Sequence, residues 1–249
     1  MLIEFARNYG VVGDTAKEQA RAFEADRLLA GLAEEKQTDA AYQISLTAAH
    51  DEVGNVQVAR GNLAAALANY QTALAIKERL ANADPGNGVW QRELAVSHSK
   101  IGNIQVAQGD LAVALTSDQV ALAITERLAK ADPGNAGQRD LAVLHNKIGD
   151  VQVAQGDLAS ALTSYQAALA IAERLAKADP GNAVWQRDLA VSHGKLVGAF
   201  RSAGQNQEAH DHLTVGRAVI ARLVEQHAAQ AAWKRLLAWF DEQIAALRP

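Results

Sequence analysis

The chain has 249 residues, a formal net charge of −4 and no cysteine. The lack of cysteine excludes disulfides and cysteine-ligated metal sites, and no apolar run of about 18 residues is present to span a membrane. Because the N-terminal segment shows no basic stretch followed by an apolar one, no export signal is predicted. We therefore expect a cytoplasmic protein with no membrane partner.

A turn sequence, Asp-Pro-Gly-Asn, occurs three times along the chain. It lies at 84–87, 132–135 and 179–182, in steps of 48 and 47 residues. The sequence around these turns is nearly the same at 105–136 and at 152–183. A period of this size predicts stacked supersecondary units rather than one globular core.

The predicted units follow one another from the N-terminus. In chain order they are an incomplete leading repeat at 1–37, a first repeat at 38–86, a second at 87–134, a third at 135–181, a degraded fourth at 182–228 and a capping helix at 229–249. Phe5 and Tyr9 set the leading segment in register with the first repeat. Trp233 echoes Trp185 at the repeat spacing, which predicts one more first-type helix at the C-terminal end.

Each unit is predicted to contain two helices. In the second repeat Asn87 is a natural N-cap, and apolar residues at helical spacing follow it as far as Gly109. A second helix is expected from about Leu111 to Leu128, where the Asp-Pro-Gly turn ends it. Such a hairpin has an apolar face too wide to bury alone, so it must stack on its neighbours.

Small residues recur at fixed places within each unit. In the third repeat the pattern consists of His145, Ile148, Gly149, Gln152, Ala161, Tyr165, Ala168 and Pro180. It resembles that of the tetratricopeptide repeat (TPR) family, except that the large aromatic at the front is missing. Family repeats have about 34 residues, so both helices should be longer here by about two turns. That length resembles the long-helix bacterial and kinesin-light-chain-like members. The resemblance implies an all-α, right-handed α-solenoid of antiparallel helix pairs.

Glycines in the middle of predicted helices indicate close packing. Gly102 and Gly149 occupy the same column, although glycine costs about 0.5–1 kcal/mol relative to alanine in a helix. We expect a neighbouring helix to approach them too closely for a β-carbon. In the fourth repeat Val197 and Gly216 depart from the small-residue pattern.

No motif for catalysis, nucleotide binding or a metal is present, so no enzyme, cofactor or metal site is predicted. One histidine column recurs once per repeat, at His50, His98, His145 and His193. Successive repeats should be displaced by roughly 10 Å, too far for two of these residues to share a zinc ion. We interpret them as semi-buried residues between the two helices of a unit. His210 and His212 flank Asp211, but near neighbours on a helix point apart, which disfavours a metal site there.

A stripe on the first helix of each repeat is the candidate partner-binding face. Its members recur at i, i+4, i+7, i+11 and i+14. The polar candidates are Asn55 in the first repeat, Arg92, Ser99 and Asn103 in the second, Arg139, Asn146 and Asp150 in the third, and Arg187 and Arg201 in the fourth. The resemblance implies that this face lines a concave groove that holds a peptide or a partner's helix. The arginines favour acidic ligands. The alternative is that they pair with a neighbouring loop or with an acidic side chain of the adjacent repeat.

These observations predict a non-catalytic protein–protein interaction scaffold. Two alternatives stay open: a structural module that self-assembles through the N-terminal end, where Leu2, Phe5 and Tyr9 share a helical face, and a regulatory or sensor part of a larger protein. A nucleic-acid reader is disfavoured, because the net charge is negative and the stripe mixes aspartate with arginine.

Overall fold

The computed structural model describes residues 40–132, 134–227 and 229–247, together with 20, 23, 24 and 27. The elements within these ranges are all α-helices, which confirms the all-α prediction there. By its contacts the chain divides into two compact units, unit 1 at 1–124 and unit 2 at 125–249. Most of the predicted leading repeat, with Leu2, Phe5 and Tyr9, falls outside the described residues. The prediction of self-association through that end therefore stays a prediction.

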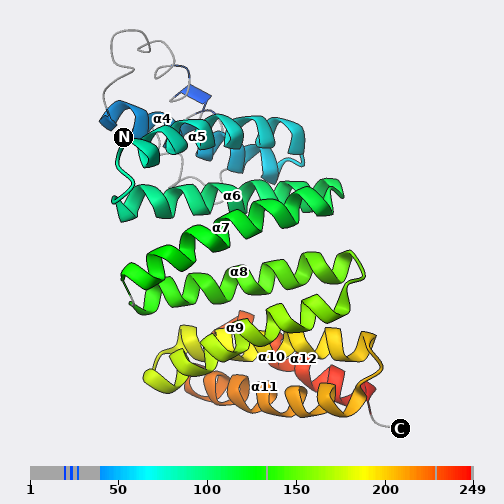
Figure 1. Ribbon diagram of the computed structural model, residues 1–249. Helices are drawn as coiled ribbons and strands as arrows, with labels where there is room; N and C mark the ends of the chain where they lie inside the picture. The colour runs from blue at the N-terminus through cyan, green and yellow to red at the C-terminus, as the bar shows by residue number, and fades with distance from the viewer. Residues whose placement is uncertain are drawn as a thin grey trace. The chain divides into compact units, whose positions relative to one another are not determined.

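Unit 1 is a row of long helices joined by short turns (Figure 1). It contains α4 (Ala40–Ala59), α5 (Leu63–Ala83), α6 (Gly88–Gln108) and the first part of α7 (Leu111–Ala131). α5 packs against α4 on one side and against α6 on the other. Consecutive helices run antiparallel, because each turn reverses the chain.

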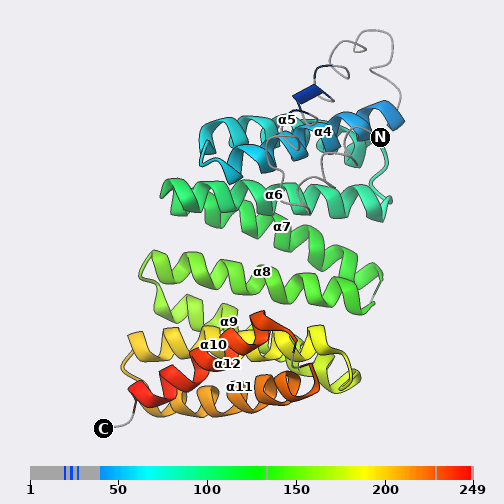
Figure 2. The same ribbon diagram turned by 180° about the vertical axis from the view of Figure 1, so that it is seen from behind.

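Unit 2 continues with the same kind of hairpin. After the end of α7 it contains α8 (Asn135–Ala154), α9 (Leu158–Ala178), α10 (Ala183–Ser202), α11 (Asn206–Gln226) and α12 (Ala231–Ala246). Each of α8 to α11 packs on the next helix in the chain. The last helix, α12, lies beside α10 and α11 (Figure 2). No helix in the described part of the chain is both long enough and apolar enough to cross a membrane.

The helix ends follow the local signals in the sequence. The Asn87 side chain accepts hydrogen bonds from the backbone N–H groups of Val89, at 3.1 Å, and Trp90, at 3.3 Å, so the predicted N-cap is confirmed. Gly109, just after α6, has a φ of 86°, which glycine adopts without a β-carbon clash. The predicted break at this position is therefore confirmed.

Tyrosine rings fill the space left by two of the mid-helix glycines. A β-carbon on Gly149 of α8 would lie 2.5 Å from Cε1 of Tyr165 on α9, and Gly54 meets Tyr70 at the same distance. The predicted close approach at Gly149 is therefore confirmed, and it involves the side chain of the neighbouring helix rather than its backbone. At Gly102 the approaching group is a carboxylate, since a β-carbon there would lie 2.9 Å from Asp118 Oδ1.

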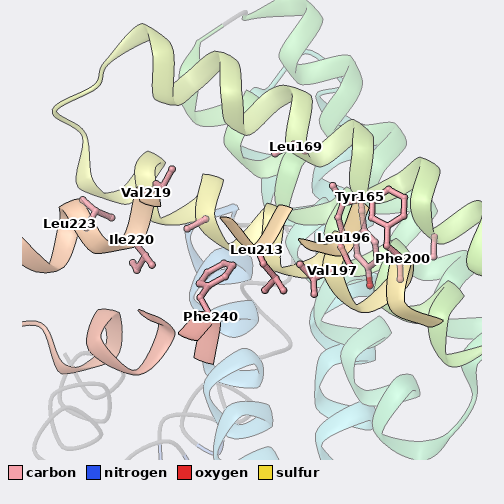
Figure 3. Close-up of a cluster of buried hydrophobic side chains, with 14 residues drawn as sticks. Tyr165, Leu169, Leu196, Val197, Phe200, Leu213, Val219, Ile220, Leu223 and Phe240 are labelled. Atoms are coloured by element: carbon pink, nitrogen blue, oxygen red, sulfur yellow. The ribbon is translucent and has the colours of Figure 1, made fainter. Parts of the chain in front are cut away.

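The departures from the pattern in the fourth repeat have a packing reason. Val197 and Leu213 occupy the positions held by Gly149 and Tyr165 in the third repeat. Valine is larger than glycine and leucine is smaller than tyrosine, so the two changes compensate each other in volume. Gly216 makes room for Phe240, whose Cζ would lie 2.5 Å from a β-carbon at that position. Figure 3 shows the Phe240 ring reaching from α12 toward Leu213, and Phe240 has no exposed surface.

Candidate partner-binding face

The predicted stripe carries exposed apolar side chains on α4, α6 and α8. Each of these side chains is between 36% and 47% exposed, and together they comprise Ile44, Val58, Val96, Val106, Val143 and Val153. Val58, Val106 and Val153 share one column of the repeats, and Val96 and Val143 share another, so exposed valine recurs although the core of neither unit needs it. Such surface commonly marks a contact site for another molecule.

A cleft in unit 2 lies along this stripe. We call it the α8–α10 cleft; its volume is about 280 Å³. Its lining comes from α8, α9 and α10 and comprises Arg139, Ala142, Val143, Asn146, Lys147, Asp150, Ala172, Leu175, Trp185, Arg187, Asp188, Val191, Ser192 and Lys195. The structure thus brings together four of the predicted site residues, Arg139, Asn146, Asp150 and Arg187.

The two arginines of this cleft share one carboxylate. Arg139 Nε lies 2.6 Å from Asp188 Oδ2, and Arg187 Nη2 lies 2.5 Å from Asp188 Oδ1. For Arg139 this is the alternative left open by the sequence, an acidic partner in the adjacent repeat. Arg187 pairs instead with the next residue of its own helix. Asp188 is therefore a member of the site that the sequence prediction did not include.

Asp150 is the second anionic group of the cleft. It accepts a hydrogen bond from the Tyr165 hydroxyl at 2.7 Å, and its oxygens lie 2.7 and 2.8 Å from Lys195 Nζ. Burial and then the bond to Asp150 raise the pKa of Tyr165, so the hydroxyl stays a donor. Asn146 Nδ2 donates to Ser192 Oγ at 3.4 Å. These contacts position the polar side chains along the cleft.

Unit 1 has a cleft at the corresponding positions. We call it the α4–α6 cleft; its volume is about 260 Å³. Its lining comprises Ile44, Thr47, Ala48, Asp51, Lys77, Leu80, Val89, Trp90 and Glu93. Ile44 stands where Arg139 stands in unit 2, and Lys77 stands where Ala172 does. The mouth of this cleft is consequently more apolar, and its floor carries a charge.

Lys77 is the buried centre of the α4–α6 cleft. Its Nζ lies 2.7 Å from Asp51 Oδ2, 2.9 Å from Ser97 Oγ and 3.2 Å from Glu93 Oε2. Lys100 Nζ lies 3.1 Å from the other oxygen of Asp51. This buried charged group was not predicted from the sequence. The available signal was a charged lysine in a column that holds the uncharged residues Thr125, Ala172 and Ile220 in the later repeats.

Solved structures with the same arrangement of helix hairpins are known, although no family model and no curated protein sequence matches this chain. One is BtubC (BKLC) from P. vanneervenii, with a TM-score of 0.69 at 19% identity over 88% of this chain and 78% of that one. The chain has a TPR-like fold. A putative kinesin light chain with TPR-like repeats from Podosopora anserina matches with a TM-score of 0.68 at 17% identity, over 90% of this chain and 95% of that one. RapI in its apo form matches with a TM-score of 0.57 at 13% identity, over 98% and 83%.

The remaining predicted residues of the second and first repeats lie on α6 and α4 of unit 1. Asn55 accepts a hydrogen bond from the Tyr70 hydroxyl at 2.8 Å, so it also orients the ring beneath Gly54. On α6, Arg92 and Asn103 are exposed and Ser99 is half-buried.

α12 contacts the stripe of the fourth repeat. Arg201 donates to Gln243 of α12 at 2.5 Å. A β-carbon on Gly194 would lie 3.2 Å from Cζ3 of Trp239 on the same helix. This part of the predicted face is therefore partly covered within unit 2, and less of it is open to a partner than along α8.

Two members of the histidine column contact the second helix of their own hairpin, His50 at Asn69 and His193 at His212. His50, His98 and His145 are half-buried and His193 is buried, as the packing interpretation predicts. Burial lowers the pKa of both His98 and His145. Among the described residues no three histidine, aspartate or glutamate side chains are grouped so that they could hold a metal ion.

Proposed function

We propose that the chain is a non-catalytic, cytoplasmic protein–protein interaction module that binds an extended peptide or a helix of a partner on the first helices of its units. The observation that carries this proposal is the set of exposed apolar side chains at matching places of α4, α6 and α8. Polar groups able to bond a peptide backbone stand between them, as Asn103 does on α6. A face with clefts of this composition supports binding of a partner.

We infer further that the α8–α10 cleft favours acidic partner segments. Its lining has four cations against the two carboxylates of Asp150 and Asp188, which leaves a formal charge of +2. Asp188 serves both Arg139 and Arg187, and a single carboxylate cannot occupy all the N–H donors of two guanidinium groups. A carboxylate of the partner can therefore bind beside Asp188 or replace it.

An array of acidic and neutral peptides tests the proposal. We expect the triple substitution Arg92→Ala, Arg139→Ala and Arg187→Ala to weaken binding of acidic peptides, by about 0.5–1 kcal/mol for each arginine, and the effect to shrink as salt rises. The matched control removes two exposed lysines at the ends of second helices, Lys130 and Lys177, and should change little. Retention of every acidic peptide by a folded triple variant would exclude these arginines from binding.

A single substitution at the shared carboxylate should have the opposite effect on the binding of acidic peptides. Asp188→Asn removes the negative charge that Arg139 and Arg187 now bind, so acidic peptides should bind more tightly. The measurement is a fluorescence anisotropy titration of the tightest acidic peptide from the array, with helicity checked by circular dichroism. Weaker binding by the folded variant would mean that Asp188 contacts the partner directly, which contradicts the acidic preference.

A further inference from the structure

Two histidines face each other across the α10–α11 hairpin of unit 2. Nδ1 of His193 lies 2.8 Å from Nδ1 of His212, and the ring centroids are 5.1 Å apart. The His212 ring also stacks on Phe200, at 5.3 Å between centroids and 13° between planes. Two ring nitrogens at this distance form a hydrogen bond only when one carries a proton and the other a lone pair. The neutral pair therefore requires opposite tautomers.

The other repeats place a non-titrating residue at the position of His212. In the first repeat His50 Nδ1 lies 3.2 Å from Oδ1 of Asn69, nineteen residues later, the same separation as in the fourth. In the second and third repeats this position holds Ser117 and Ser164, whose hydroxyls donate to glutamine side chains at 2.8 and 2.7 Å. Among these four hairpins, the fourth repeat is thus the one in which two titrating rings contact each other at this position.

We propose that the His193–His212 pair is an acid-sensitive contact that holds α10 to α11 while at most one ring is protonated and loosens when both are. A first proton leaves one N–H pointing at one lone pair, so the hydrogen bond persists. A second proton sets two N–H groups and two positive charges against each other at 2.8 Å. His193 is 5% exposed, so water screens this repulsion poorly.

The surroundings keep both rings neutral near pH 7. Burial, and then His212, lowers the pKa of His193 from 6.5 to about 4. Burial also lowers the pKa of His212, against the opposite effect of Asp211 on α11 and Glu173 on α9. On the side of α12 the neighbour is the apolar ring of Phe240, near Gly216 and the Cβ of His193.

The sign of the pH effect follows from these directions. A folded-state pKa below the unfolded value of 6.5 means that the unfolded chain binds protons more readily. The stability contributed by the pair is therefore complete above pH 6.5 and is lost as the pH falls toward 4. For His193 alone the folding equilibrium constant should fall by at most about 20-fold between pH 7 and pH 5.

Exchanging the partner residues between repeats tests the proposal on the full chain. His212→Asn gives the fourth repeat the partner that His50 has in the first, and Asn69→His gives the first repeat the partner that His193 has in the fourth. In urea unfolding at pH 7 and pH 5, we expect a smaller acid loss for His212→Asn than for the wild type, and a larger one for Asn69→His. Equal acid losses in the wild type and in His212→Asn would overturn the proposal.

A second measurement needs no substitution. Nitrogen-15 chemical shifts of the histidine rings at pH 7 should show one member of the pair protonated at Nδ1 and the other at Nε2. Hydrogen exchange, corrected for its intrinsic pH dependence, should show that the amides of α10 and α11 lose protection at pH 5. The amides of α4 and α5 should keep their protection at the same pH. Identical tautomers, or equal loss in both hairpins, would refute the assignment.

Discussion

The contact between Gly149 and Tyr165 allows the close packing of α8 on α9 to be measured. In Gly149→Ala the new β-carbon would lie 2.5 Å from Cε1 and 2.7 Å from Cδ1 of Tyr165. The ring has little freedom to move, because it is 3% exposed and its hydroxyl is bonded to Asp150 at 2.7 Å. Overpacking of this kind costs about 1–3 kcal/mol, and alanine returns about 0.5–1 kcal/mol of helix propensity. We expect a net loss of about 0.5–2 kcal/mol, and about 1–3 kcal/mol for the larger change Gly149→Leu.

A matched glycine separates packing from helix propensity. Gly198 lies within α10, and a β-carbon there would meet nothing within 4 Å. Gly198→Ala should therefore gain about 0.5–1 kcal/mol. Urea unfolding followed by circular dichroism gives the free energies, and the two variants should differ by about 1–3 kcal/mol. If Gly149→Ala is as stable as Gly198→Ala, the close-packing argument fails.

A double substitution tests the same contact from the partner side. The fourth repeat holds Val197 and Leu213 at these two positions, so Gly149→Val with Tyr165→Leu copies a pair that packs within the same unit. Each single change should destabilise the chain, and the double variant should recover at least about 1 kcal/mol relative to their sum. Strict additivity would show that the two positions do not compete for one space.

Two further substitutions test the ends of the packed region. Phe240→Ala removes a ring with no exposed surface and should cost about 3–5 kcal/mol in urea unfolding, whereas the exposed Val215→Ala should stay within about 0.5 kcal/mol; equal effects would mean that α12 contributes no core. Lys77→Met leaves Asp51 and Glu93 without their buried partner and should cost about 3 kcal/mol. A thermal melt within a degree of the wild type would show that the lysine is dispensable for stability.

Local features of the fold could be predicted because their causes are local. Asn87 caps α6 through its own side chain, and the Asp-Pro-Gly turns end helices by the geometry of proline and glycine. Gly149 could be identified as a close contact because glycine inside a helix is costly without one. What lies against each glycine could not be predicted, and the answer differs between Tyr165 and Asp118 in the same column.

The partners of the site residues could not be predicted for a different reason. Arg139 and Asp188 are 49 residues apart, and ion pairs near the surface contribute too little energy to leave a pattern in one sequence. The repeat period does limit the candidate partners of each polar residue, since Asn146 and Ser192 are 46 residues apart and Asp150 and Lys195 are 45 residues apart. A search for opposite charges one period along the chain would have found Asp188. The burial of Lys77 depends on groups from two other helices, and no local signal identifies them.

The contacts of Lys77 limit how a chain made of similar copies can be rearranged. Its ammonium group joins Asp51 of the first repeat to Ser97 and Glu93 of the second. If recombination put the third repeat in place of the first, Ala172 would stand in this column, and the polar groups on α6 would lose their cation. Copies that are similar in sequence are therefore not interchangeable in order. Gain or loss of a whole repeat would be tolerated only where the side chains across the new junction still complement each other.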